Sequence, residues 1–256
     1  LYKGHTIQPY STAAGTGLSS HELNQPGCYK DVKDRTAVAM FKVLDSNYNK
    51  LPFNISNIPE SFRNIYILAW TTTPWTLPSN TALAVGKDID YVAIQTFNPF
   101  SFEDITAIVA KDLYEKYFVK TDYAFLGEAE IIEVKNKAKE SKKPQAILVN
   151  IAGEFKGSDL AGIQYEQLLP FVKPEGKAFE VITGDFVTTT DGTGIVHIAP
   201  SFGADDFRVA QQNGVPAIMV KDESGKEVPI VNRQGRFVAE ITDFANEPVK
   251  EAYLSD

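Results

Sequence analysis

Short apolar segments bounded by turn residues recur along most of the chain. Runs of about four to eight residues of this kind are typical of β-strands. The pattern predicts strands over residues 38–43, 65–70, 92–96, 146–150, 178–183 and 194–199. Every position from 65 to 70 is apolar, so we expect that strand to be buried on both faces.

Few segments show helical spacing. The sequence Ser101-Phe102-Glu103-Asp104 resembles a capping box, and the apolar residues after it predict a helix up to Tyr117. A second helix is expected over residues 204–212, because Asn213-Gly214 is a favoured helix stop, and a third is expected near residues 248–254. Many strands and few helices indicate a mainly β fold, a barrel or sandwich with peripheral helices.

The composition is that of a globular chain. Of its 256 residues, 43% are hydrophobic and 23% charged, which argues against disorder, and no apolar run is long enough to cross a bilayer. The first residues include no secretory signal and no initiator methionine, so we expect a fragment excised from a larger protein. Cys28 is the single cysteine, which excludes an internal disulfide and favours a reducing cytosol.

The formal net charge of −8 restricts how this chain meets a nucleic acid. Proteins that bind by neutralising phosphates carry basic stripes. The one basic run, within KNKAKESKKP at residues 135–144, is expected to be a solvated loop. A nucleic acid is therefore expected to enter as a terminus in a pocket, with most of the electrostatic affinity supplied elsewhere.

The most informative segment is WTTTPWTLPSN, residues 70–80, directly after the predicted buried strand. Pro74 and Pro78 restrict the residues before them to extended conformations, so we expect a rigid loop and no helix. The loop displays hydroxyls, an indole and an amide, which suit a ribose, an adenine edge or an ester. Threonines and Thr-Pro turns are common in any β protein, but the two spaced prolines, the Trp and the terminal Asn favour a functional loop.

A second motif, GTGIVHIAPSFGADDF, spans residues 192–207. It predicts a turn, a strand and a helix in succession. Taken alone, His197 in a strand is most simply structural, and Asp205 and Asp206 in the first turn of a helix complement its dipole. A metal site formed by these three residues stays open as an alternative, although the spacing does not specify one.

Together the two motifs resemble the signatures of the editing domain that is inserted in class I aminoacyl-tRNA synthetases, in the form found in the isoleucine enzymes. The valine and leucine enzymes typically carry TTRP followed by an acidic residue, where this chain has Thr73-Pro74-Trp75. The resemblance covers nearly the whole chain and implies a single β-barrel-centred editing domain over residues 1–256. Many bacterial relatives carry cysteines where residues 9–15 have none, which argues against a cysteine-based metal site here.

The resemblance also implies residue roles. In the family, an aspartate nine positions after the motif histidine binds the α-ammonium of the misattached amino acid, which corresponds to Asp206. The histidine, here His197, borders the amino-acid pocket and excludes the larger cognate side chain. The last threonine of the threonine run and the asparagine seven positions later correspond to Thr73 and Asn80, which with Asp206 form the expected catalytic set.

Three further residues complete the expected substrate-binding set. Thr71 and Thr72 are expected to contact the terminal adenosine, and Trp75 to form an apolar wall or a platform for a base. An aminoacyl ester is already activated, so its hydrolysis needs a well-placed water more than a strong nucleophile. We therefore expect no covalent intermediate, no cofactor and no metal ion.

The implied function is post-transfer editing, the hydrolysis of the ester that links misattached valine to tRNA(Ile). The expected partners are the 3′ end of that tRNA and the rest of the parent synthetase, and the expected form is a cytoplasmic monomer. The HIGH and KMSKS signatures do not occur in the sequence, so ATP-dependent synthesis is not expected from this chain. Two alternatives remain: a catalytically silent insert that docks the tRNA acceptor end, and an unrelated metal-dependent hydrolase that uses Asp205 and Asp206.

Overall fold

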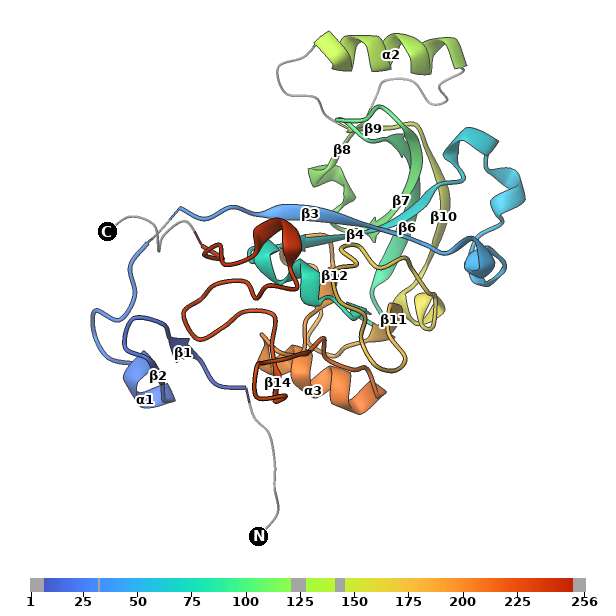
Figure 1. Ribbon diagram of the computed structural model, residues 1–256. Coiled ribbons are helices and arrows are strands. Elements are labelled where there is room, and N and C mark those ends of the chain that lie inside the picture. The colour runs from blue at the N-terminus through green and yellow to red at the C-terminus, as the bar shows by residue number, and fades with distance from the viewer. Residues whose placement is uncertain (1–6, 32, 121–127, 141–145, 251–256) are drawn as a thin grey trace.

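The fold is built around two β-sheets, as the computed structural model in Figure 1 shows. The structure describes residues 7–31, 33–120, 128–140 and 146–250. The larger sheet has the strand order β10-β6-β7-β4-β3 and the smaller sheet the order β11-β5-β12. The strands of the larger sheet are β3 (Ala37–Lys42), β4 (Ile65–Thr71), β6 (Asp90–Phe97), β7 (Asp104–Ala110) and β10 (Asn150–Lys156). Those of the smaller sheet are β5 (Ala82–Val85), β11 (Glu180–Thr183) and β12 (Ile195–Ile198).

Shorter elements surround these sheets. Three two-stranded pairs are β1 (Tyr10–Ser11) with β2 (Thr16–Gly17), β8 (Phe118–Lys120) with β9 (Ala146–Leu148), and β13 (Val220–Lys221) with β14 (Glu227–Val228). The α-helices are α1 (Ser20–Leu23), α2 (Glu128–Glu140) and α3 (Ala204–Asn213). Short 3-10 helices are η1 (Asp45–Lys50), η2 (Ile55–Asn57), η3 (Glu60–Phe62), η4 (Pro74–Ser79), η5 (Tyr114–Lys116), η6 (Gly157–Leu160) and η7 (Thr242–Phe244). No helix among the described residues is long and apolar enough to span a membrane.

The main core lies between the two sheets. One buried cluster combines side chains of the larger sheet, such as Phe41 and Ile108, with side chains of the smaller one, such as Leu83 and Ile195. A second cluster covers the opposite face of the larger sheet, and a third packs α3 on the smaller sheet. The prediction that the strand after residue 64 is buried on both faces is confirmed, because Ile67 and Leu68 of β4 belong to different clusters.

The expected closed barrel is absent from the described part of the chain. The two sheets form separate hydrogen-bonded ladders. They are joined on one side by the isolated bridges Val43–Tyr165 and Gln164–Glu180, and a backbone bond runs from Ala110 N–H to the Thr193 carbonyl. The architecture is therefore a mixed α/β fold of two linked open sheets with helices outside them, and the prediction of a barrel as its centre is wrong.

The helix predicted after residue 101 is wrong, because this segment forms β7 between β6 and β4. Residues 105–110 are all buried, with alternate side chains in the two clusters on either face of the sheet. The polar residues that resembled a cap instead form the β6–β7 turn, where Asn98 Oδ1 accepts the N–H groups of Phe100 and Ser101. A central strand that is apolar on both faces satisfies helical spacing by accident.

The other helix predictions have mixed outcomes. The helix expected over residues 204–212 is confirmed as α3, which ends at Asn213 and is followed by Gly214, whose φ of 66° is left-handed. The solvated loop expected from residue 135 is wrong up to Glu140, where α2 ends, and residues 141–144 lie outside the described residues. Of the helix expected near 248–254, residues 248–250 are not helical and the rest lie outside the described residues.

Candidate functional site

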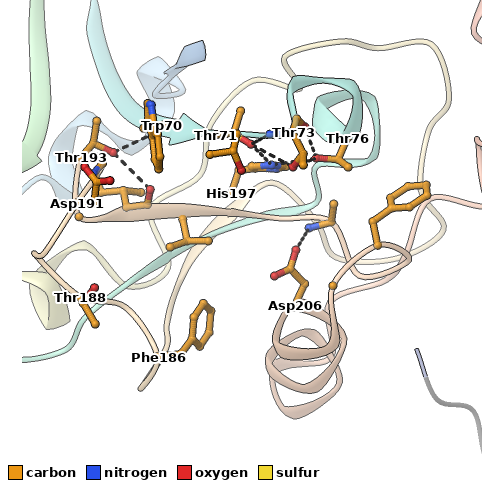
Figure 2. Close-up of a pocket in the computed structure, with 18 of the residues that line it drawn as sticks. Trp70, Thr71, Thr73, Thr76, Phe186, Thr188, Asp191, Thr193, His197 and Asp206 are labelled. Atoms are coloured by element: carbon orange, nitrogen blue, oxygen red, sulfur yellow. Dashed lines mark hydrogen bonds between the residues drawn. The ribbon is translucent and has the colours of Figure 1, made fainter. Parts of the chain in front are cut away.

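A cavity of about 430 Å³ opens where the two sequence motifs meet. Its walls come from the end of β4, the start of η4, the strand β12, the first turn of α3 and the segment 186–194 (Figure 2). The volume lies within the range of about 300–1,000 Å³ that is typical of small-molecule sites. The lining residues are Trp70, Thr71, Thr72, Thr73, Thr76, Phe186, Thr188, Thr190, Asp191, Gly192, Thr193, Gly194, Ile195, Val196, His197, Ala199, Phe202, Gly203 and Asp206.

The threonine-rich loop reaches the cavity because the chain turns sharply after β4. Pro74 begins the 3-10 helix η4, which is closed by the bond from Thr76 N–H to the Thr73 carbonyl at 3.0 Å. The expectation of a loop without helix is therefore wrong. Pro74 stands at the first helical position, where its missing N–H costs nothing, so the prolines exclude an α-helix here but permit a short 3-10 turn.

The hydroxyls of this loop form a connected network. Thr71 Oγ1 accepts the backbone N–H of Thr73 at 3.0 Å, and the Thr76 hydroxyl donates to the Thr73 carbonyl at 2.8 Å. The Thr73 hydroxyl oxygen lies 3.4 Å from that of Thr71 and 3.5 Å from that of Thr76. Thr71 and Thr76 are buried, Thr73 is half-buried and Thr72 is exposed. Buried neighbours therefore fix the position of Thr73 at the cavity wall.

His197 lies beside this network on β12, with 7% of its surface exposed. Its Nε2 atom is 3.1 Å from Thr76 Oγ1 and 3.4 Å from Thr71 Oγ1. Burial lowers the pKa of His197 to about 4, so the ring is neutral at pH 7. A ring with so low a pKa is a weak base, and it serves as a polar wall of the cavity.

The two neighbouring aspartates have different surroundings. Asp206 Oδ2 accepts the backbone N–H of Ala199 at 2.9 Å, and Figure 2 shows this carboxylate turned from α3 toward β12. A Cβ atom at residue 203 would lie 2.8 Å from Asp206 Cγ, so Gly203 makes room for the carboxylate. Asp205 is exposed and binds Arg208 instead. Burial raises the pKa of Asp206, against the lowering effect of the Ala199 N–H.

The charges of the cavity favour a cation. Asp191 and Asp206 are the ionisable acids in the lining, and none of the lining residues is Lys or Arg. His197 is neutral, so the site presents carboxylates, hydroxyls and apolar surface. Such a lining favours an ammonium group and a neutral polar group, and it disfavours a phosphate.

The structure does not bring Asn80 to the cavity. Asn80 is buried at the end of η4, where its Oδ1 accepts the Tyr165 hydroxyl at 2.8 Å and its Nδ2 donates to the Ala82 carbonyl at 2.8 Å. Burial raises the pKa of Tyr165 well above its ordinary value, so this hydroxyl stays protonated as a donor. Asn80 therefore ties the loop to β5 without lining the space in which a substrate would lie.

Trp75 also points away from the cavity. Its ring packs edge-on against Phe202 with centroids 5.1 Å apart, and it joins the cluster formed by residues such as Ile230 and Phe237. Phe202 in turn lines the cavity. Trp75 therefore supports the site from behind, and in this structure it offers no platform for a base inside the cavity.

Some lining residues were missed by the sequence reasoning. Thr76 lies within the quoted motif but received no role, although its spacing of three residues from Thr73 is what a helical turn brings together. Phe186 and Thr188 come from a segment without a recognisable pattern, and Asp191 was interpreted only as part of the turn before the second-motif strand. No signal in the sequence alone indicates that this segment faces the threonine loop.

The lysines considered for phosphate binding and the residues considered for metal binding do not form such sites in the described part of the chain. Within the basic run, Lys135 binds Asp104, Lys137 binds Glu133 and Lys139 lies over the Phe102 ring, which leaves them poorly placed for phosphates. Across the described residues, no three His, Cys, Asp or Glu side chains come together in a way that could hold a metal ion.

Comparison with known proteins finds relatives that match the chain over most or all of its length, although no family model matches it. It is 55% identical to the isoleucine–tRNA ligase of Cytophaga hutchinsonii over 100% of this chain and 21% of that protein. It is 52% identical to the isoleucine–tRNA ligase of Porphyromonas gingivalis over 93% of this chain and 19% of that protein. The chain thus spans about one fifth of the length of these curated relatives.

Solved structures give a weaker likeness. The editing domain of the P. knowlesi cytosolic leucyl-tRNA synthetase superposes with a TM-score of 0.48 at 17% identity, over 70% of this chain and 64% of that chain. The sequence matches are far stronger and extend over the whole chain. The chain therefore belongs to the isoleucine–tRNA ligase family and corresponds to about one fifth of such an enzyme.

Proposed function

We propose that this chain is the editing domain of its synthetase and hydrolyses the ester of valine misattached to tRNA(Ile). The observation that supports the proposal most is the meeting of the two motifs in one cavity, where Thr73, His197 and Asp206 line a space with carboxylates and without a basic side chain. An aminoacyl ester presents an ammonium, a small side chain and ribose hydroxyls, and these groups match that lining.

Asp206 binds the α-ammonium of the substrate. Its carboxylate is half-buried, and the Ala199 N–H holds one of its oxygens at 2.9 Å. An ionised carboxylate has several lone pairs and can accept the ammonium as well, and a charge-assisted bond of this kind is about twice as strong as a neutral one. The approaching cation also removes the cost of burying the ionised carboxylate, so binding and ionisation reinforce each other.

The threonine loop orients the ester and the attacking water. Thr73 is the half-buried hydroxyl at the centre of the network, and Thr72 is the exposed hydroxyl at its rim. Thr71 and Thr72 contact the terminal adenosine, and Thr73 holds the reacting ester. Because the ester is activated, correct placement of water supplies most of the required acceleration. A neighbouring ribose hydroxyl of the substrate assists the proton transfer, since His197 is too weak a base.

The cavity discriminates by size. A hydrophobic synthetic site separates side chains that differ by one methylene by only about 10- to 200-fold, and isoleucine against valine in this enzyme family is the standard example of that limit. A second site can reverse the logic by admitting valine and rejecting isoleucine through overpacking. His197 is buried and held by two threonines, so it forms an unyielding wall for this purpose.

Asn80 and Trp75 act indirectly in this proposal. Asn80 anchors the end of η4 through Tyr165 and Ala82, and Trp75 holds Phe202 at the cavity from behind. The partners are the 3′ end of tRNA(Ile) and the rest of the synthetase. With a net charge of −8, this chain leaves the phosphate contacts to that larger part. We place the activity in the cytoplasm, where the exposed Cys28 stays reduced.

The two alternatives are less well supported. Asp205 and Asp206 do not converge on one point, because Asp205 binds Arg208 and Asp206 binds Ala199, which disfavours a metal-dependent hydrolase built on the pair. A silent docking insert would not need a carboxylate kept half-buried beside a hydroxyl network. An assay for release of the amino acid from Val-tRNA(Ile) tests that alternative, since a silent insert releases none.

A structure of the full synthetase with a non-hydrolysable valyl-adenosine mimic tests the proposal. The expected complex has the ammonium of the mimic within hydrogen-bond distance of Asp206 and its side chain against His197. A mimic bound outside this cavity, or bound with its ammonium away from Asp206, contradicts the proposal.

A further inference from the structure

The turn Gly192-Thr193-Gly194 belongs to the second motif, and the proposed function gives its central residue no role. Thr193 lines the cavity wall, yet it is only 1% exposed. Its hydroxyl has partners within the protein, the Trp70 N–H and the Ile195 carbonyl. Thr193 therefore belongs to the frame of the cavity and does not offer its hydroxyl to a substrate.

Thr193 lies where two strands of the larger sheet part. β4 and β7 pair in parallel from Ile65 to Ile67, and the pairing ends there although both strands continue. Beyond that point Thr193 bonds to both strands. Its Oγ1 accepts the Trp70 N–H of β4 at 3.2 Å, and its carbonyl accepts the Ala110 N–H of β7 at 2.9 Å. One residue thus takes the place of the missing strand partner on each side.

A third bond reaches the same turn from the larger sheet. Tyr91 of β6 is fully buried, and its hydroxyl donates to the Gly194 carbonyl at 2.7 Å. Gly194 has a left-handed φ of 70°, and a Cβ atom there would collide with the side chain of Ala110, so the close approach requires glycine. Three strands of the larger sheet are therefore hydrogen-bonded to residues 193 and 194, which lead directly into β12 of the smaller sheet.

The bond to β4 has a fixed direction. A backbone N–H only donates, so Thr193 Oγ1 must accept from Trp70. The hydrogen of the Thr193 hydroxyl then points to the Ile195 carbonyl at 3.4 Å, at the start of β12. Figure 2 shows Thr193 next to Trp70, joined to it by this bond. A single hydroxyl thus links β4 to β12.

The two strands lead to the two halves of the candidate site. Trp70 is followed directly by the threonine loop, in which Thr73 lies three residues later. β12 is followed by Ala199, whose N–H holds Asp206. A shift of β4 against β12 would therefore move Thr73 relative to Asp206. A misplacement of about 1 Å between reacting groups can cost about 100-fold in rate.

We propose that Thr193 is a positioning residue, whose hydroxyl holds the threonine loop at its working distance from Asp206. This role rests on the proposed function for its substrate. Thr193 does not touch the substrate in it, and the bond between Ala199 and Asp206 remains in place without the hydroxyl. Loss of the hydroxyl should therefore slow the chemical step and leave substrate binding nearly unchanged.

The test compares the wild-type full synthetase with three variants in single-turnover hydrolysis of Val-tRNA(Ile). Thr193→Val keeps the side-chain shape and removes the hydroxyl, and Thr193→Ser keeps the hydroxyl. Thr106→Val is the matched control, because the Thr106 hydroxyl is also fully buried and donates to the Phe62 carbonyl at 2.7 Å. Thr106 lies at the opposite end of the β4–β7 pair and outside the cavity lining. The maximal rate and the half-saturating enzyme concentration are measured separately.

We expect Thr193→Val to lower the maximal rate about 10- to 100-fold, with a half-saturating concentration within about threefold of wild type. Thr193→Ser and Thr106→Val should keep the wild-type rate within about threefold. A wild-type rate in Thr193→Val overturns the positioning role. An equal loss in Thr193→Ser or in Thr106→Val also overturns it, because the cause would then be side-chain shape or general destabilisation. A change confined to the half-saturating concentration overturns it as well, since it would indicate a substrate contact.

A second readout does not depend on hydrolysis. Hydrogen exchange of the full synthetase, followed by mass spectrometry, reports on the peptide that contains Trp70 and the threonine loop. We expect exchange there to be about five- to tenfold faster in Thr193→Val, the effect of losing one buried hydrogen bond, and unchanged in Thr193→Ser and Thr106→Val. Thr193→Ala, with less bulk at the Trp70 N–H, serves in both measurements if Thr193→Val does not fold.

The two measurements separate the possible failures. Wild-type exchange in the variants without the hydroxyl overturns the positioning role, whatever the enzyme hydrolyses. Failure of the proposed function is seen separately, as a wild-type enzyme that releases no valine.

Discussion

Asp205 and Asp206 are adjacent in the first turn of α3, yet their carboxylates lie in different surroundings and have different partners. Asp205 is exposed and binds Arg208 at 3.3 Å, whereas Asp206 lines the cavity and binds the Ala199 N–H at 2.9 Å. One pair of identical side chains thus separates a surface ion pair from a candidate substrate anchor. This contrast gives the proposed site an internal control.

The raised pKa of Asp206 predicts a pH dependence of activity. The carboxylate must be ionised to bind an ammonium, and burial raises its pKa above the ordinary 3.8. We expect kcat/KM for Val-tRNA(Ile) hydrolysis to fall as the pH drops through this raised pKa. The full synthetase assayed across the acidic range gives the profile, and activity that is flat to below pH 3.8 contradicts the assignment.

The same shift predicts an effect on stability. Between the ordinary pKa and the raised one, the folded state binds more protons than the unfolded state, so the contribution of Asp206 to stability falls as the pH rises. At neutral pH the ionised carboxylate is therefore a cost. Asp206→Asn should make this chain at least as stable as wild type toward urea at pH 7, with the difference fading below pH 3.8. A clearly less stable variant would show that the carboxylate is kept for structure.

His197→Ala should widen the cavity. Removing the ring leaves space beside Thr71 and Thr76, and a side chain that is one methylene larger can then enter. We expect hydrolysis of correctly charged Ile-tRNA(Ile) to rise at least about tenfold relative to Val-tRNA(Ile), the worth of one methylene in such a pocket. If the variant still spares the isoleucyl ester while it hydrolyses the valyl one, His197 is not the size filter.

Asn80→Ala should act through stability. The change leaves the fully buried Tyr165 hydroxyl without its acceptor, which costs about 1–3 kcal/mol. Tyr165→Phe in the Asn80→Ala background should cost little more, because the two residues share one interaction. Urea unfolding of the single and double variants measures this coupling, and additive losses would contradict it.

Trp75→Ala should also act mainly by lowering the stability of the chain, and not by removing a contact with the substrate. The indole packs on Phe202 and on the cluster around Ile230, so its removal leaves a hole costing about 3 kcal/mol or more. Trp75→Phe should retain most of the stability. Unchanged unfolding together with a specific loss of tRNA affinity would instead favour the expected base platform.

Much of the site was predictable from sequence because its chemistry is concentrated in two short motifs. Thr73 and Asp206 are far apart in the chain, yet the resemblance to the editing domains led us to expect them at one site, and the cavity contains both. The position of Asn80 could not be predicted in the same way. Whether an amide faces a cavity or a buried tyrosine depends on Tyr165, which lies 85 residues away.

The fold was less predictable where local patterns are ambiguous. Residues 105–110 satisfy helical spacing only because both faces of β7 are buried, and the choice between strand and helix is made by the neighbouring strands β6 and β4. The polar run after Glu133 looks like a loop by composition, but the spacing of Glu133 and Lys137 supports a helix. Whether the sheets close into a barrel depends on pairing between strands that are far apart in the sequence, and turn residues do not predict such pairing.

The most direct test of the account is the rate at which the full synthetase releases valine from Val-tRNA(Ile), compared between Asp206→Ala and Asp205→Ala. The account predicts a loss of at least about 10- to 100-fold for Asp206→Ala, the worth of a hydrogen bond to a charged group. Asp205→Ala should stay within about twofold of wild type, as an exposed position does. A wild-type rate in Asp206→Ala, or an equal loss in Asp205→Ala, would contradict it.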